Sequence, residues 1–306
     1  MKVKERTNME ASCRDTEMKG ILKYHPCFSR EAHHKYGRIH VPVAPACNIQ
    51  CRYCVRKFDC ASESRPGVTS RVLRPEEGLE RIRAAVGRDE RVSVVGIAGP
   101  GDPLANEATF ELLEMARAEF PQLILCLSTN GLLLTEKVDE LARLGVKTLT
   151  VTINSITEEM AGKIYKWALH GGKLYKGPEA GRLILRNQWE GLRAAVSAGF
   201  AVKVNTILMP GLNEEEIPAI AEKAGGIGAD LINIMALIPQ GDFAGLNKPS
   251  IHEITRMRHA CLPYINIMSH CKQCRADACG TLGQDGDMET EALMARIGEE
   301  YEDAVC

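Results

Sequence analysis

Short apolar segments alternate with amphipathic ones along most of this chain, and the alternation limits which folds it can adopt. The apolar segments are rich in Val, Ile and Leu and are bounded by Gly, Pro or Asn, as buried β-strands are. They cover Ile39–Ala44, Val92–Ala98, Leu123–Ser128, Thr148–Ile153, Val202–Leu208 and Leu231–Leu237. The helical patterns cover Glu76–Val86, Asn106–Glu119, Glu136–Leu144, Gln188–Ala198, Glu214–Gly225 and His252–Leu262. Strands that alternate with helices pair in parallel, so we expect an α/β fold, an incomplete TIM-like (βα)6 barrel.

The six units leave segments at both ends of the chain outside the barrel. We expect an N-terminal extension over 1–36, the partial barrel over 37–265, and a C-terminal extension over 266–306 that ends in a flexible tail. Both extensions carry Cys or His residues that could bind a metal. No Pro/Gly-rich linker separates two bodies, and no solenoid-type repeat occurs, so the sequence predicts one domain.

Charge and hydropathy exclude several classes of protein. The chain has 38 basic and 40 acidic residues, a formal net charge of −2, whereas nucleic-acid-binding proteins carry a clear basic excess. Its first 20 residues are charged throughout and lack the apolar segment of a secretion signal. No apolar run approaches the roughly 18 residues that span a bilayer. We therefore expect a cytoplasmic protein that binds neither nucleic acid nor membrane.

Cysteine is unusually frequent and is clustered. The chain has 12 Cys among 306 residues, fewer than the roughly 8–10% that marks a disulfide scaffold. In a reducing compartment, clustered Cys indicates metal binding or catalysis. The two clusters are Cys47, Cys51, Cys54 and Cys60, and then Cys271, Cys274 and Cys279.

The first cluster has the spacing CxxxCxxC over Cys47, Cys51 and Cys54, directly after the first predicted strand. Three thiolates in such a loop can hold three irons of a [4Fe–4S] cubane and leave the fourth iron open to another ligand. A zinc site or a chance grouping is the alternative, although a structural zinc site normally has four protein ligands. The pattern therefore favours an iron–sulfur cluster.

The segment CNIQCRYC resembles the signature of the radical S-adenosylmethionine (SAM) superfamily. The resemblance implies that the open iron binds the methionine end of SAM. One-electron reduction then gives a 5′-deoxyadenosyl radical. It also implies that Cys47, Cys51 and Cys54 are the catalytic cluster ligands.

Polar residues at later strand ends match places where this superfamily binds SAM. In Gly99-Pro100-Gly101-Asp102-Pro103, after the second predicted strand, the backbone would pair with the methionine amino group. The SAM-binding residues expected from the resemblance are Gly99, Gly101, Asp102, Ser128, Asn130, Asn154 and Asn205. Taken singly, each is equally consistent with a turn or a helix cap.

A longer series of motifs carries a closer resemblance. In order along the chain they are HPCF, PVAPACNIQCRYCVRKFDC, GIAGPGDPLAN, LSTNGL, KVNTILMPGLN and CKQCRADACG. From His25 to about Gly280 the chain resembles the NifB family of nitrogenase cofactor maturases, in the short form without a NifX-like C-terminal domain. The resemblance implies an enzyme with lyase or transferase chemistry that fuses two [4Fe–4S] clusters around a carbide. One SAM would methylate a cluster sulfide, and a second would start hydrogen abstraction from that methyl group, giving the eight-iron cofactor precursor.

The resemblance also implies ligands for two substrate clusters besides the SAM-binding one. His25, Cys27 and Cys60 would hold one substrate [4Fe–4S] cluster, and Cys126, Cys271 and Cys274 would hold the other. How these six ligands divide between the two substrate clusters stays open. The roles of Glu63, Arg65 and Cys279 stay open.

Two other functions compete with this hypothesis. A different radical SAM enzyme could use the extra Cys for permanent auxiliary clusters, but those normally have four ligands each. A non-enzymatic iron–sulfur carrier would need none of the SAM-binding residues. The maturase hypothesis further implies three partners: a scaffold that donates clusters, a low-potential ferredoxin or flavodoxin, and a carrier or scaffold that receives the product.

Overall fold

The computed structural model describes residues 20–62 and 69–284. Its main sheet has eight strands in the order β10-β9-β8-β5-β4-β3-β1-β11. Six of them alternate with helices: β1 (Gly37–His40), β3 (Val92–Ile97), β4 (Ile124–Thr129), β5 (Val146–Thr152), β8 (Ala201–Leu208) and β9 (Leu231–Ala236). These six are parallel neighbours in chain order. The prediction of an α/β partial barrel with six βα units is therefore confirmed.

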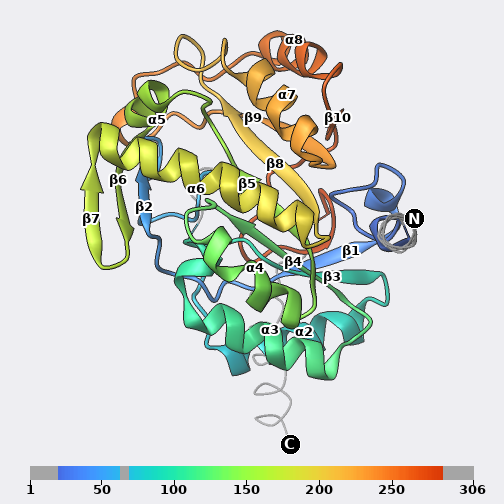
Figure 1. Cartoon of the computed structure of the whole chain (residues 1–306). Coiled ribbons are helices and arrows are strands. Elements are labelled where there is room, and N and C mark those ends of the chain that lie inside the picture. Colours follow the sequence, from blue (N-terminus) through green and yellow to red (C-terminus); the bar gives the residue numbers. More distant parts are fainter. Residues whose placement is uncertain (1–19, 63–68, 285–306) are drawn as a thin grey trace, which may run out of the picture.

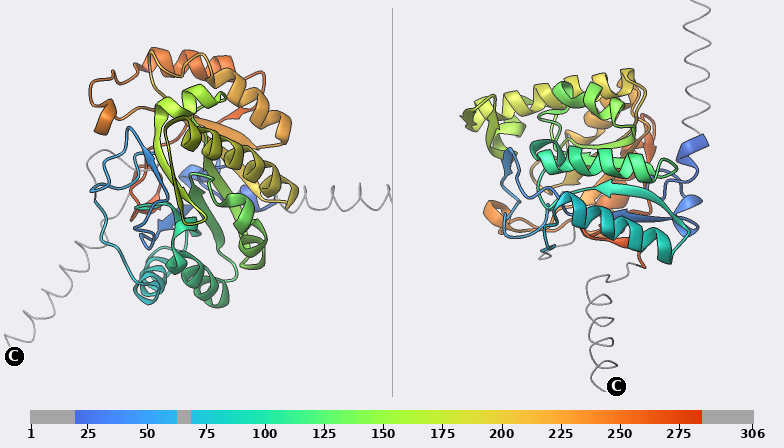
Figure 2. Two further views of the ribbon diagram at one scale, coloured as in Figure 1. Left: turned by 60° about the vertical axis from the view of Figure 1, so that its left-hand side comes forward. Right: turned by 90° about the horizontal axis from the view of Figure 1, so that it is seen from below.

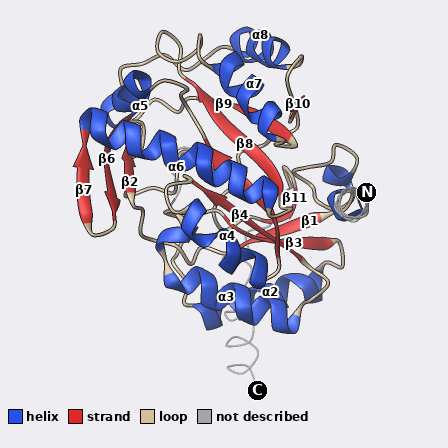
Figure 3. Ribbon diagram, viewed as in Figure 1, coloured by secondary structure: helices blue, strands red, loops and turns tan. Residues whose placement is uncertain are grey.

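The helices cover the outer face of this curved sheet, as Figure 1 and Figure 3 show. They are α2 (Pro75–Arg88), α3 (Glu107–Glu119), α4 (Leu134–Arg143), α5 (Glu158–Ile164), α6 (Gly177–Ser197), α7 (Ile217–Ile227) and α8 (Ile251–Cys261). Short 3-10 helices occur at Ala32–His34 (η1), Pro103–Ala105 (η2) and Gly241–Phe243 (η3). The start of α8 shows why the sequence forms helices here, since Ser250 and Glu253 make a capping box that satisfies the first backbone N–H groups.

The core lies between the sheet and these helices. Val, Ile and Leu side chains on the outer face of the strands pack against the apolar stripes of the helices. No described helix is both long enough and apolar enough to cross a membrane.

The edges of the sheet come from the C-terminal region. Strand β10 (Asn266–Ile267) adds in parallel beside β9, and β11 (Cys279–Thr281) pairs antiparallel with β1. The described part of the predicted C-terminal extension thus completes both edges of the barrel sheet. The tail after residue 284 lies outside the described residues, as do Glu63 and Arg65.

Two details of the expected secondary structure differ from the structure. The first strand ends at His40, and only Ala44 of the remaining predicted residues makes a further bridge, to Pro100. The helix predicted over Gln188–Ala198 is the second half of α6, which begins at Gly177 with Pro178 in its first turn. Proline is favoured at that position because its missing N–H would have no helical partner there.

A second, three-stranded antiparallel sheet was not predicted. It joins β2 (Ile49–Cys51), β6 (Tyr165–His170) and β7 (Lys173–Lys176). Strands β6 and β7 form a hairpin whose two-residue loop is Gly171-Gly172, with φ of +55° and +73°. Such loops need φ above zero at both positions, which glycine adopts without strain. Figure 2 shows this hairpin and the N-terminal segment at opposite ends of the molecule.

Candidate functional site

Two adjoining pockets lie on the inner side of the barrel. The cysteine-loop pocket is lined by Cys47, Cys51, Cys54, Cys60, Arg56, Gly101, Asp102, Asn130 and Tyr165, among others. The inner pocket is lined by His25, Cys27, Arg38, His40, Cys126, Lys203, Asn205, Cys271 and Cys274, among others. Ser128 lines both pockets, so they meet at the end of β4.

The alternation of side chains along each strand determines which residues line the inner pocket. Side chains alternate between the two faces of a strand, so residues two apart share a face. On β1 these are Arg38 and His40, and on β4 they are Cys126 and Ser128. Lys203 and Asn205 on β8 are a third such pair. One face of the sheet packs on the helices, and the opposite face supplies the lining of the pocket.

The cysteine loop is held in place from two sides. On one side, Asp102 N–H and Gly101 N–H donate to the carbonyls of Ala46 and Ala44 at 2.8 and 2.5 Å. On the other side, the Gln50 side-chain amide donates to the Cys51 and Cys54 carbonyls, both at 2.9 Å. The loop backbone is thus fixed independently of any bound metal.

Asp102 connects the glycine-rich turn to the end of β4. Its carboxylate accepts hydrogen bonds from Leu104 N–H, Thr129 Oγ1 and Asn130 N–H at 2.6–3.1 Å. Burial nevertheless raises the pKa of this carboxyl to about 6, because the hydrogen bonds only partly offset its desolvation. Asn130 in turn donates to Asn48 Oδ1 at 2.7 Å and lies 3.8 Å from Cys47 Sγ.

Gly101 is required by the close approach of this turn to the cysteine loop. A Cβ at this position would overlap the Ala46 carbonyl, with its carbon only 2.6 Å away. We expect Gly101→Ala to lower the free energy of unfolding by about 2–4 kcal/mol, because backbone would have to move. Urea unfolding of the metal-free chain measures this. The control is Gly87→Ala on the surface of α2, where a new Cβ would meet no atom within 4 Å. We expect this change to raise the free energy of unfolding by about 0.5–1 kcal/mol, because alanine is the better helix former. Equal stabilities for the two variants would contradict the steric argument.

Three distant parts of the chain assemble the inner pocket. His25 and Cys27 come from the N-terminal segment, Cys126 from β4, and Cys271 and Cys274 from the segment before β11. His270 Nε2 and the Pro26 carbonyl lie 3.0 Å apart, which joins the two terminal segments. His40 attaches the C-terminal segment to β1, since its backbone N–H donates to the Ala278 carbonyl at 2.7 Å.

The imidazole of His25 has the properties of a neutral metal ligand. Its Nδ1 accepts the Cys27 N–H at 3.1 Å, and its buried Nε2 has no hydrogen-bond partner among the described residues. Burial lowers the pKa of His25 to about 3, with the charge of Lys203 adding to the effect. The ring is therefore uncharged, as a histidine ligand must be.

Arg38 and Lys203 are inner-pocket residues that the sequence analysis did not single out. Arg38 is almost wholly buried, donates to the carbonyls of Gly280 and Thr281, and places Nη2 2.9 Å from Cys274 Sγ. Lys203 is also buried, and its positive charge acts on both His25 and Cys27. For Lys203 the signal in the sequence was a charged residue inside an otherwise apolar predicted strand, because burial of such a charge needs a partner. Arg38 precedes the strand predicted from Ile39 and carried no such signal.

Arg38 attaches the segment that carries Cys274 to the barrel. We expect Arg38→Met to lower the free energy of unfolding by about 2–4 kcal/mol, since the Gly280 and Thr281 carbonyls lose a charged donor. Faster amide exchange across β11 should accompany the loss. The control Arg83→Met removes an exposed ion pair with Glu119 and should change stability little. Unchanged β11 exchange in Arg38→Met would show that the guanidinium does not hold this segment.

The structure groups the nine predicted ligands differently from the expected partition. Cys60 lines the cysteine-loop pocket, whereas His25 and Cys27 line the inner pocket together with Cys126, Cys271 and Cys274. The cause is local: Cys60 follows Cys54 by only six residues, and the hydroxyls of Ser62 and Tyr53 lie 3.1 Å apart, which joins the segment after Cys60 to the cysteine loop. The structure thus brings Cys126 to Cys27 and leaves Cys60 with Cys51 and Cys54.

The predicted SAM-binding residues also separate into groups. Gly101, Asp102, Ser128 and Asn130 line the cysteine-loop pocket, but Asn205 lines the inner pocket. Asn154 is fully buried, donates to Tyr53 Oη at 2.8 Å and accepts from Ile207 N–H at 2.8 Å. Neither Asn154 nor Gly99 is among the described residues that line either pocket. Their binding roles stay predictions, and for Asn154 the contacts are those of a residue that supports Tyr53.

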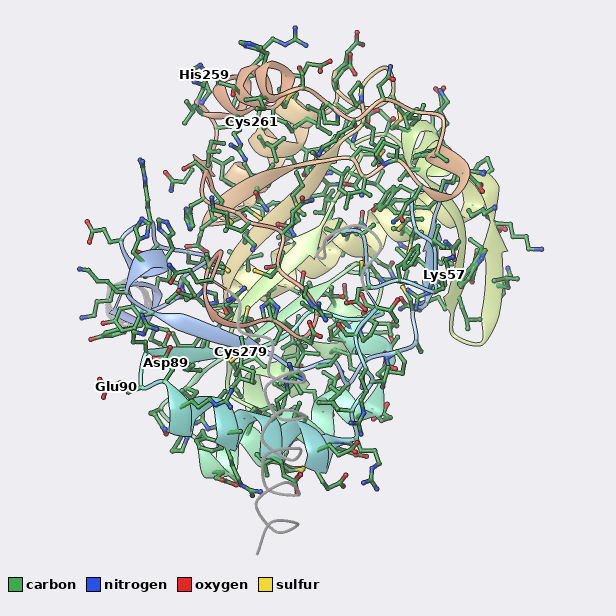
Figure 4. All side chains as sticks on the ribbon, turned by 180° about the vertical axis from the view of Figure 1, so that it is seen from behind. Lys57, Asp89, Glu90, His259, Cys261 and Cys279 are labelled. Atoms are coloured by element: carbon green, nitrogen blue, oxygen red, sulfur yellow. The ribbon has the colours of Figure 1, made fainter. Side chains whose placement is uncertain are left out.

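Among the described cysteines, Cys261 on α8 and Cys279 on β11, both labelled in Figure 4, line neither pocket. Cys261 is fully buried in the core. Cys279, whose role the sequence left open, is also buried and pairs with Ile39 across β1 and β11.

The donor set of the pockets fits iron–sulfur clusters. Burial raises the pKa of Cys47 and of Cys274 to about 12, so each becomes a thiolate only when a metal displaces its proton. In residues 20–62 and 69–284, no three His, Cys, Asp or Glu side chains converge as closely as a single ion requires. A cubane presents irons at four corners and binds each thiolate at a different one. The buried Ser128 Oγ, which has no hydrogen-bond partner in the described part of the chain, leaves a polar atom for a ligand where the pockets meet.

Comparison with known proteins defines the class first. The sequence model of the Radical SAM superfamily matches residues 41–224, so the chain belongs to that superfamily, whose members use a [4Fe–4S] cluster and SAM. Solved structures agree on the fold. A radical SAM methyltransferase from Sphaerobacter thermophilus aligns over 76% of this chain and 64% of its own, with TM-score 0.52 and 21% identity. SAM-bound SuiB from Streptococcus suis aligns over 78% and 52%, with TM-score 0.54 and 15% identity.

Curated relatives then define the family. FeMo cofactor biosynthesis protein NifB from Klebsiella pneumoniae is 46% identical over 89% of this chain, which spans 59% of that protein. The protein of the same name from Methanocaldococcus infernus is 44% identical over 86% of this chain, which spans 87% of it. The chain belongs to the NifB family, as its motifs predicted.

Proposed function

We propose that this chain fuses two [4Fe–4S] substrate clusters and inserts a carbide from a SAM methyl group, yielding the eight-iron precursor of the nitrogenase cofactor. The observation that carries the proposal is the pair of adjoining pockets. One contains the three-cysteine loop, and the other contains the five predicted ligands His25, Cys27, Cys126, Cys271 and Cys274, which come from three distant segments. The relatives' name, FeMo cofactor biosynthesis protein NifB, supports the same function. The chemistry combines methyl transfer with hydrogen abstraction, of the lyase or transferase kind.

The cysteine-loop pocket would bind the SAM-cleaving cluster through Cys47, Cys51 and Cys54. When bound, that cluster supplies the electron that cleaves SAM. The protein's own part is to hold the reactants in place. The Asp102 network fixes the turn next to Cys47. Asn130 places its side-chain amide beside Cys47, and Ser128 offers a hydroxyl where the two pockets meet.

The inner pocket would hold the substrate clusters. His25, Cys27, Cys126, Cys271 and Cys274 supply fewer ligands than two cubanes with four each would need, so iron corners stay open for fusion and release. Arg38 and Lys203 supply positive charge that offsets the negative charge of sulfide and thiolate ligands. We propose that Cys60 acts from the neighbouring pocket, as the substrate-cluster ligand closest to the SAM-binding loop.

The proposed reaction needs three partners. A scaffold protein must deliver the substrate clusters, and a low-potential ferredoxin or flavodoxin must supply electrons. A carrier or scaffold must take the product, because a cluster freed into water would be lost.

A carbon-tracing experiment tests the proposal. The chain is reconstituted anaerobically with iron and sulfide, reduced with dithionite, and given SAM labelled with ¹³C in its methyl group. The proposal predicts 5′-deoxyadenosine together with label retained in the iron–sulfur product. SAM cleavage with all label recovered outside the cluster would contradict carbide insertion and leave a different radical SAM reaction.

A further inference from the structure

The β6–β7 hairpin presents a basic surface. Residues 163–176 contain four lysines, Lys163, Lys166, Lys173 and Lys176, and no carboxylate, although the whole chain carries a net charge of −2. All four lysines are exposed. Arg56 and Lys57, also exposed, follow the cysteine loop, and Figure 4 labels Lys57 on the hairpin side of the molecule. We call these six side chains the basic surface.

Most of its positive charge is not neutralised locally. Asp242 pairs with Lys166 and Arg52, and Glu159 pairs with Lys163. Lys57, Lys173 and Lys176 form no ion pair with a carboxylate of the described residues, and Lys57 and Lys173 lie over the rings of Phe58 and Tyr175. The excess would attract a negatively charged partner.

The same hairpin exposes an apolar pair of side chains. Leu169 and Leu174 are directly opposite each other across the hairpin, with 46% and 49% of their surface exposed. In the same register Lys176 lies on the face of the hairpin that carries the two leucines, and Lys173 lies on the opposite face. The leucines thus add an apolar contact beside the lysines, as protein-binding surfaces do.

The hairpin is joined directly to the cysteine loop. Strand β2, which includes Cys51, pairs with β6, and Cys51 lies opposite Tyr165 (Figure 1). The loop is also bonded through its backbone, because Arg52 N–H donates to the Ile164 carbonyl at 2.9 Å. A protein bound to the hairpin would therefore be beside the cysteine loop and away from the N-terminal segment.

We propose that the basic surface, together with Leu169 and Leu174 on the same hairpin, is the docking site of an acidic electron-transfer protein. The inference rests on the proposed function, since that chemistry needs an electron at the cysteine loop. One electron would pass from the reduced iron–sulfur or flavin centre of the donor to the cluster held by Cys47, Cys51 and Cys54. The donor is thereby oxidised by one electron. The reduced cluster would pass that electron to SAM, whose C–S bond breaks to give methionine and the 5′-deoxyadenosyl radical. Opposite charge would raise the rate of encounter, and the leucines would fix the bound position.

The test compares two ways of supplying the electron. A small reductant, dithionite, needs no docking site, whereas an acidic [4Fe–4S] ferredoxin does. We expect the double variant Lys173→Glu/Lys176→Glu to slow ferredoxin-driven formation of 5′-deoxyadenosine about tenfold or more at low salt. Its dithionite-driven rate should match that of the unmodified chain. The control Lys35→Glu/Lys223→Glu makes the same charge change at exposed positions before β1 and on α7, away from the hairpin.

Binding is measured separately, so the result does not depend on catalysis. Calorimetric titration with oxidised ferredoxin should give a clearly weaker Kd for the hairpin variant than for the control variant. Equal Kd values and equal ferredoxin-driven rates for both variants would overturn the docking site. A parallel loss with dithionite would also overturn it, because the lysines would then support the loop itself. If unmodified protein binds ferredoxin through the hairpin but cleaves no SAM with dithionite, the proposed function fails and the docking site stands.

Discussion

Replacing any one of Cys47, Cys51 or Cys54 by alanine should abolish SAM cleavage. The three thiols line one pocket and come from a loop whose backbone is fixed by Gly101, Asp102 and Gln50. The scaffold would survive the change, but one iron would lose its protein ligand. Changes outside the ligands of a metal site already cost about 10–100-fold, so we expect a loss of more than ~100-fold. The measurement is 5′-deoxyadenosine formed per chain after anaerobic reconstitution and reduction by dithionite.

The matched control is Cys261→Ala, which removes a thiol that is fully buried in the core and lines neither pocket. It should destabilise the chain slightly, because it leaves a small cavity, and should retain SAM cleavage. If Cys51→Ala cleaved SAM at the rate of this control, the cysteine loop would not hold the reacting cluster.

Replacing Cys271 by alanine should separate SAM cleavage from product formation. Cys271 lines the inner pocket with Cys27 and Cys274 and does not line the cysteine-loop pocket. We therefore expect the SAM-binding cluster to assemble and cleave SAM at a near-normal rate. The eight-iron product should be lost, and the iron content of the reconstituted chain should fall by about four. Iron analysis and ¹³C-methyl tracing on the same sample check both parts.

Cys279→Ala is the control, because this thiol is in the same C-terminal region but belongs to β11 and packs in the hydrophobic core. It should keep both the iron content and the product. Full product formation by Cys271→Ala would contradict the assignment of the inner pocket to substrate clusters.

The barrel could be predicted because its determinants are local. Each strand is a short Val/Ile/Leu segment ended by Gly, Pro or Asn, and each helix has an apolar stripe, so the βα order fixed the parallel neighbours. The hairpin was missed although its signal was present. His170-Gly171-Gly172-Lys173, between segments of β-forming residues, is a favoured two-residue turn.

The site was predicted less completely, because its grouping depends on contacts between distant segments. The sequence places Cys60 close to the cysteine loop, whereas the resemblance assigned it to a cluster with His25 and Cys27, which the structure places in the inner pocket. Arg38 precedes the strand predicted from Ile39, and its partners, Cys274 and Gly280, lie more than 230 residues away. Asn154 follows a strand like the other candidate ligands, yet it turns toward Tyr53.

Iron analysis combined with electron paramagnetic resonance tests the central claim most directly. The chain is reconstituted anaerobically with iron and sulfide, and spectra of the reduced protein are recorded with and without SAM. The two-pocket account predicts about twelve irons per chain, with SAM changing only part of the signal, since one cluster binds SAM and two are substrates. About four irons, all responding to SAM, would contradict it, because His25, Cys27, Cys126, Cys271 and Cys274 would then hold no cluster.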